Sequence, residues 1–184
     1  MRCGVTRISC AVYNETWIGD AALHELARLV HSVGDVPGAL IEFGCWEGRS
    51  IVQIAEAAGN RPVHAVDHWQ GNLGDEYTLE ALKTRDVYAE FMLNTAHLAN
   101  LQVHRTSTDE FMRGWDQPIA LLHIDADHNY VPVREQITWA LERMSPGGVL
   151  CGDDYSHRWP GVVRAVDELL PDKTLTECMW VHRA

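Results

Sequence analysis

The sequence predicts an α/β protein, built as a three-layer sandwich with helices on both faces of a mostly parallel sheet. Short apolar runs of strand length alternate along the chain with longer segments that have the three- and four-residue apolar spacing of helices. The apolar runs are nearly continuous, as expected for parallel strands that helices cover on both faces.

The expected helices begin and end at identifiable signals. Asp20 and Ser107 are suited to cap the helices that follow them, Pro132 is tolerated in the first turn of another, and Pro37-Gly38 follows the end of the first. The helices are expected at residues 21–33, 49–58, 77–97, 108–115, 130–144 and 160–170.

The expected strands lie between these helices. They cover residues 39–43, 62–67, 101–105, 119–125 and 148–152, and residues 173–183 are expected to form a terminal hairpin. Crossovers from strand to helix to strand are almost always right-handed and join parallel strands. The sequence therefore predicts a Rossmann-like, mostly parallel seven-stranded sheet with a C-terminal antiparallel hairpin.

Length and composition narrow the class of protein. Residues 1–184 are expected to form one domain, with residues 1–18 as an irregular N-terminal arm in which Tyr13 or Trp17 could fold over a ligand. The net charge of −11 argues against nucleic acid or an anionic membrane surface as the main partner. No apolar stretch has the length of a transmembrane helix. Five cysteines without a C-x-x-C pair favour a reduced, cytoplasmic protein.

Acidic residues follow two of the expected strands. Asp125 ends the strand at 119–125, and Asp153 and Asp154 follow the strand at 148–152. Ligands bind to open α/β sheets at the carboxyl ends of the strands, where these carboxylates would repel one another unless they were protonated or bound a cation. Three carboxylates are hard oxygen ligands, which favour Mg²⁺, with Ca²⁺ or Mn²⁺ possible. Asp127 is expected to remain outside this ligand set.

The turn after the first strand limits the choice of cofactor. A dinucleotide site requires G-x-G-x-x-G, but the positions of the second and third glycines hold Trp46 and Arg49. The phosphate-binding pattern G-x-x-x-x-G-K-[ST] is also absent from the sequence. The turn therefore suits a cofactor that does not bind through phosphate groups.

The pattern Glu42-x-Gly44-x-x-x-Gly48-x-Ser50 resembles the turn of class I S-adenosylmethionine-dependent methyltransferases, and the resemblance extends from about residue 20 to residue 184. It implies that Glu42, Gly44 and Ser50 line the methionine end of the cofactor and that Asp67 binds both ribose hydroxyls. Ser107 and Thr108 would border the adenine. The full implied cofactor set is Glu42, Phe43, Gly44, Cys45, Ser50, Asp67, His68, Ser107, Thr108 and Asp125.

At its strand-end acids the chain resembles the metal-dependent subset of this family. That subset includes catechol O-methyltransferase and, more closely, the sugar O-methyltransferases of macrolide and aminocoumarin biosynthesis, together with sequences named cephalosporin hydroxylases. The resemblance implies that Asp125, Asp153 and Asp154 bind the metal and that His128, three residues after Asp125, is the general base.

Three further residues are candidates for contact with the acceptor substrate: Tyr155, His157 and Trp159. His123, in contrast, is expected to pack as an ordinary strand residue.

The sequence thus predicts an S-adenosylmethionine-dependent, divalent-metal-dependent O-methyltransferase that acts on a hydroxyl of a small molecule, either a sugar or natural product or a catechol-like diol. Two alternatives stay open: a metal-independent methyltransferase, and a non-catalytic subunit that binds S-adenosylmethionine. A homo-oligomer is possible, since another subunit could supply a lid over the site.

Overall fold

The computed structural model describes residues 11–72 and 74–184. Residues 11–18 of the expected arm contain neither helix nor strand. Residues 1–10, which include Cys3 and Cys10, lie outside the described residues.

A seven-stranded sheet with the order β3-β2-β1-β4-β5-β7-β6 forms the centre of the fold. Neighbouring strands from β3 to β5 are parallel, and β7 is antiparallel to both β5 and β6. The predicted fold class, including the C-terminal hairpin, is therefore confirmed. The strands are β1 (Ala39–Phe43), β2 (Val63–Asp67), β3 (Leu101–Arg105), β4 (Ile119–Ile124), β5 (Met144–Gly152), β6 (Thr174–Thr176) and β7 (Met179–Arg183).

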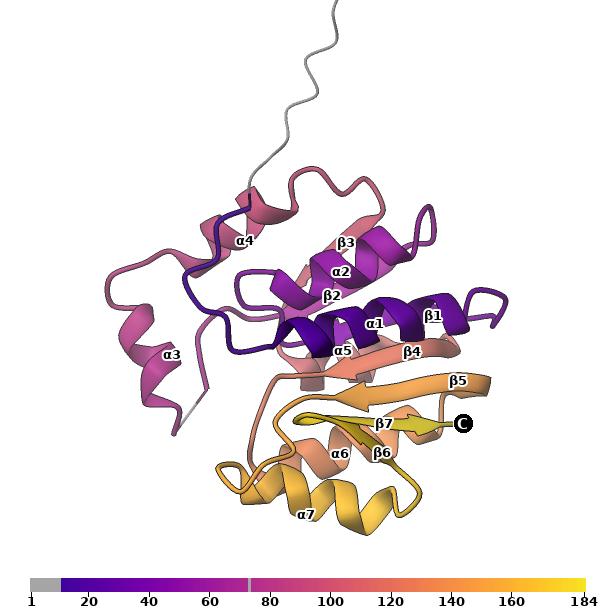
Figure 1. Cartoon of the computed structure of the whole chain (residues 1–184). Coiled ribbons are helices and arrows are strands. Elements are labelled where there is room, and N and C mark those ends of the chain that lie inside the picture. The colour runs from indigo at the N-terminus through magenta and orange to yellow at the C-terminus, as the bar shows by residue number, and fades with distance from the viewer. Residues whose placement is uncertain (1–10, 73) are drawn as a thin grey trace, which may run out of the picture.

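Helices cover both faces of this sheet, as Figure 1 shows. Alternate strand residues face opposite sides, so Leu40 packs in the core beneath α1, α2 and α4, whereas Ile41 packs in the core shared with α5, α6 and α7. None of the described helices is both long and apolar enough to cross a membrane. The helices are α1 (Asp20–Ser32), α2 (Arg49–Ala57), α3 (Glu76–Ala81), α4 (Val87–Thr95), α5 (Thr108–Gly114), α6 (Tyr130–Leu141) and α7 (Pro160–Leu169).

The prediction of one helix over residues 77–97 is wrong, because the chain forms α3 and α4 with a break between them. Asp75 caps α3 by accepting from the Tyr77 N–H at 3.1 Å, and Asp86 starts α4 by accepting from the Ala89 N–H at 3.0 Å. A second capping carboxylate inside the expected helix provides the local signal for the break. The helix expected to reach residue 144 also ends earlier, since β5 already begins at Met144.

The turn after β1 lies against the end of β4. Gly44 donates its N–H to the Val66 carbonyl at 2.9 Å, while Asp125 donates its N–H to the Phe43 carbonyl at 2.8 Å. Gly44 has a φ of +80°, and a Cβ atom there would overlap the carbonyl oxygen of Asp125. Only glycine permits both the left-handed backbone and this close approach.

We expect Gly44→Ala to lower the free energy of unfolding by roughly 2–5 kcal/mol, because left-handed strain and overpacking against backbone add together. Gly59→Ala is the matched control. Gly59 has a φ of +62° with no atom within 4 Å of a built Cβ, so it isolates the left-handed strain at about 1 kcal/mol. Urea unfolding measures both losses, and equal losses would contradict a role for the contact with Asp125.

Candidate functional site

A cavity of about 640 Å³ lies at the carboxyl ends of the parallel strands, with walls from the segments that follow β1, β2, β3, β4 and β5. The strand order changes direction between β1 and β4, where open α/β sheets bind ligands. Most of the predicted cofactor residues line this cavity: Gly44, Cys45, Ser50, Asp67, His68, Ser107, Thr108 and Asp125.

Glu42 and Phe43 are the predicted cofactor residues that do not line the cavity. Both are fully buried. Glu42 Oε1 lies 2.7 Å from His123 Nδ1 on the neighbouring strand, so His123 is a buried strand residue packed against a neighbour, and that neighbour is a carboxylate. The other oxygen of Glu42 and the Nε2 of His123 have no hydrogen-bond partner among the described residues. A contact between Glu42 or Phe43 and the cofactor stays a prediction.

The Asp67 carboxylate is fixed by backbone donors around the cavity. Its Oδ2 accepts from the N–H groups of Cys45 at 2.9 Å and Trp46 at 3.0 Å, and its Oδ1 accepts from the N–H of Trp69 at 2.6 Å. These bonds hold the turn after β1 against the end of β2. A carboxylate has about four acceptor positions, so one remains for a ligand hydroxyl in this arrangement.

Three carboxylates converge on the wall formed by the ends of β4 and β5. Burial raises the pKa of Asp125 well above its usual value, and the charges of Asp154 and Asp153 add to this rise. Burial also raises the pKa of Asp153, with Asp154 as the next cause. Ionising all three groups is therefore unfavourable unless a positive charge is bound among them. This donor set fits a divalent cation.

His128 completes this cluster. One ligand atom from each of Asp125, His128 and Asp154 lies within 4.8 Å of the other two. The His128 Nε2 is 2.8 Å from Asp154 Oδ2. Asp153, the third predicted ligand, is not part of this group of three, and its Oδ1 accepts the N–H of Asp154 at 2.8 Å.

The imidazole of His128 is held from the other side by Trp159. The two rings are stacked with centroids 3.8 Å apart and an interplanar angle of 22°. Gly161, in the first turn of α7, allows this approach, because a Cβ atom there would overlap the carbonyl oxygen of His128. The loop after β4 is thus clamped against the start of α7, which orients the imidazole toward the carboxylates.

Of the three predicted acceptor contacts, Trp159 lines the cavity. The Tyr155 hydroxyl donates to Asp167 Oδ1 at 2.8 Å instead, and neither Tyr155 nor His157 lines the cavity. Their contact with an acceptor stays a prediction.

The segment at residues 12–18 forms a further wall. Glu15, Trp17 and Ile18 line the cavity, and the Trp17 ring packs at 5.8 Å on the ring of Trp46. Of the two aromatic residues that could fold over a ligand, Trp17 therefore lies at the cavity and Tyr13 does not line it.

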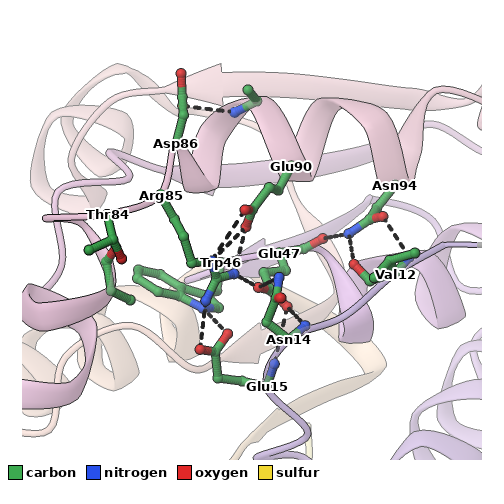
Figure 2. A network of polar contacts seen from close by, with 12 residues as sticks. Val12, Asn14, Glu15, Trp46, Glu47, Thr84, Arg85, Asp86, Glu90 and Asn94 are labelled. Carbon is green, nitrogen blue, oxygen red and sulfur yellow. Dashed lines mark hydrogen bonds and ion pairs between the residues drawn. The ribbon is translucent and has the colours of Figure 1, made fainter.

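This wall is tied down by a polar network that sequence reasoning missed, shown in Figure 2. The side chain of Glu47 is 2% exposed. Its carboxylate accepts from the N–H of Asn14 at 2.8 Å and from the Asn14 Nδ2 at 2.9 Å, and it contacts Arg85. Arg85 also pairs with Glu15 at 2.7 Å and with Glu90 at 2.5 Å.

Asn94 adds a second attachment point in the same network (Figure 2). Its side chain accepts from the Val12 N–H and donates to the Val12 carbonyl, both at 3.1 Å, and it donates to the Glu47 carbonyl at 3.0 Å. These partners are as much as 82 residues apart in the sequence, so no local pattern could have indicated them.

Residues 41–155 match a protein family described as "Methyltransferase domain". The chain belongs to this methyltransferase family. The resemblance to class I methyltransferases, first seen in the turn after β1, is thereby confirmed, and the observed strand order agrees with it.

Mycinamicin III 3''-O-methyltransferase of Micromonospora griseorubida is 28% identical to the chain over 166 aligned residues. The match covers 76% of this chain and 65% of the relative, so the chain spans less than two thirds of that protein's length.

Solved structures share the methyltransferase fold. The O-methyltransferase NovP superposes with a TM-score of 0.73 at 21% identity, covering 91% of this chain and 81% of NovP. The calicheamicin methyltransferase CalS11 gives a TM-score of 0.65 at 18% identity, covering 88% and 78%. An O-methyltransferase from Bacillus cereus gives 0.59 at 17% identity, covering 89% and 80%.

We expect Glu47→Ala to destabilise the methyltransferase by roughly 3 kcal/mol, because it leaves Arg85 and Asn14 without a buried partner. It should also speed proteolysis within residues 12–18. Glu90→Ala is the control, since Glu90 pairs with the same arginine but its side chain is 29% exposed; its cost should stay under about 1 kcal/mol. Thermal unfolding measures the stability loss of each variant, and limited proteolysis measures cleavage within residues 12–18. Equal effects of the two variants would contradict the role of Glu47 in attaching this segment.

Proposed function

We propose that the chain transfers the methyl group of S-adenosylmethionine to a hydroxyl of a small molecule beside a bound divalent cation. The observation that carries this proposal is the meeting of His128 with Asp125 and Asp154 at the wall of the cavity. The acceptor we favour is a sugar or glycosylated natural product. The name of the relative mycinamicin III 3''-O-methyltransferase agrees with such an acceptor.

The turn after β1 and the ends of β2 and β3 would hold the cofactor. Gly44 and Ser50 would face its methionine end, and Ser107 and Thr108 its adenine. Asp67 would accept one ribose hydroxyl at its remaining acceptor position. Binding of the second hydroxyl would require Asp67 to release one of the three backbone N–H groups that it accepts now.

Asp125, Asp153 and Asp154 would hold the cation, and Mg²⁺ suits a site of carboxylate oxygens. When bound, such a cation lowers the pKa of a coordinated hydroxyl and fixes its position. If Mg²⁺ is the metal, His128 is better suited to act as a base than as a ligand, because imidazole suits softer metals.

When bound, S-adenosylmethionine would supply the methyl group to the acceptor oxygen, with S-adenosylhomocysteine as the leaving group. His128 Nε2 now lies 2.8 Å from Asp154 Oδ2, and it would accept the proton of the hydroxyl once the cation takes up that carboxylate. Stacking on Trp159 keeps the ring in this orientation. Correct placement of the two reactants should account for most of the acceleration.

Calorimetric titration tests this proposal with S-adenosylhomocysteine, in the presence and absence of Mg²⁺, and then with Mg²⁺ alone. Binding of S-adenosylhomocysteine, together with a separate Mg²⁺ site, supports the proposed function. Nucleoside binding without a metal site favours the metal-independent alternative. Binding of both without transfer to any hydroxyl acceptor favours the non-catalytic alternative.

We expect Asp125→Asn to abolish Mg²⁺ binding and methyl transfer, and excess EDTA to abolish transfer by the unaltered protein. The same variant should raise the melting temperature of the metal-free protein by roughly 2–4 °C, because one crowded, buried negative charge is removed. Calorimetry and thermal unfolding measure the two effects. Asp127→Asn is the control. Asp127 also lines the cavity, but its carboxylate accepts from the N–H of Asn129, so the Asp127→Asn protein should bind Mg²⁺ normally.

We expect His128→Gln to slow methyl transfer by about 100-fold or more, in keeping with the loss of a general base, while Mg²⁺ and nucleoside affinities remain unchanged. Single-turnover kinetics measures the rate of methyl transfer, and calorimetry measures the Mg²⁺ and S-adenosylhomocysteine affinities. A loss of Mg²⁺ affinity in this variant would instead make His128 a metal ligand.

A further inference from the structure

Arg158 differs from the other arginine at the cavity. The guanidinium groups among the described lining residues are those of Arg49 and Arg158. Arg49 pairs with Asp20 at 2.8 Å. Within residues 11–72 and 74–184, no carboxylate forms an ion pair with Arg158, although acidic side chains are plentiful in the same cavity.

Arg158 is exposed to solvent and its guanidinium contacts two aromatic rings. Its guanidinium carbon lies 5.1 Å from the ring centroid of Tyr77 on α3 and 5.0 Å from that of Trp159, just before α7. Both rings line the cavity, so the contact joins two of its walls. The N–H donors of a guanidinium group lie in its plane, so contact with aromatic faces leaves them available for a planar anion.

The same indole ring connects Arg158 to the proposed base. Trp159 stacks on His128 at 3.8 Å and is also the ring beside Arg158. The proposed proton acceptor and the guanidinium therefore both contact one indole ring, close enough together for a single sugar-sized acceptor to reach both. An acceptor with its reacting hydroxyl at His128 would present its opposite side to Arg158.

We propose that Arg158 binds an anionic oxygen group, a phosphate or a carboxylate, carried by the sugar acceptor on the side away from the hydroxyl that is methylated. This inference rests on the proposed methyltransferase function. A guanidinium group binds either anion through two parallel hydrogen bonds. Most of the charged side chains that line the cavity are acidic, so such an arginine favours anionic acceptors at this one position.

Calorimetry on protein saturated with S-adenosylhomocysteine and Mg²⁺ tests the inference with three probes: methyl glucoside, glucose 1-phosphate and glucuronate. We expect at least one charged probe to bind about tenfold more tightly than the neutral one. Arg158→Gln should remove this preference and leave the affinity for S-adenosylhomocysteine unchanged. Arg158→Lys should retain only part of the preference, because it keeps the charge without the planar fork. The two charged probes distinguish phosphate from carboxylate.

Arg164→Gln is the matched control, since Arg164 lies over the Tyr130 ring at 3.9 Å but does not line the cavity. The Arg164→Gln variant should change neither the affinity for the charged probes nor the affinity for S-adenosylhomocysteine. The inference is overturned if no charged probe binds more tightly than methyl glucoside, or if the preference survives in Arg158→Gln. Mg²⁺ remains available in that variant, so any contribution of the metal to anion binding is present in both proteins. Failure of S-adenosylhomocysteine to bind, measured first, would remove the proposed function itself.

Discussion

The backbone of the parallel sheet forces carboxylates together, and the rest of the site depends on this constraint. Asp125 donates its N–H to the Phe43 carbonyl, and Asp153 donates its N–H to the Ile124 carbonyl, so ladder hydrogen bonds fix where β4 and β5 release their acidic residues. The Cα atoms of Asp125 and Asp153 cannot separate without breaking these bonds. Burial then raises the pKa of Asp125 and of Asp153, and only protons or a cation relieve the repulsion.

Backbone strain is concentrated around the same cavity. Trp46 and Asp154 adopt left-handed backbone with φ of +45° and +65°, and both line it. Such a conformation costs free energy in a residue with a Cβ atom, and more so in one as bulky as tryptophan. It persists because neighbouring bonds over-determine it: the Trp46 N–H is bound to Asp67, and the Asp154 N–H to Asp153. The cavity walls are therefore held in shape before any ligand binds.

Local sequence patterns were enough to predict the sheet and the acids at its edge, because strand ends are marked by where an apolar run stops. They failed where a distant partner decides the outcome. Arg85 pairs with Glu15, 70 residues away, and the buried Glu42 pairs with a histidine in another strand. The family resemblance implies that Glu42 lines the methionine end of the cofactor, yet its observed partner is His123.

The loop between β5 and α7 combines two tasks that proteins often assign to separate elements. Asp153 and Asp154 begin it at the wall where the carboxylates converge, while Arg158 and Trp159 end it, with Trp159 stacked on His128. Any shift of this loop would move the carboxylates, the ring that orients His128 and the arginine beside that ring in concert. If Arg158 binds the acceptor and His128 is the base, as proposed, acceptor recognition and base orientation would be coupled through this short segment of backbone. An acceptor bound to Arg158 would then also favour the loop position in which His128 faces the cluster.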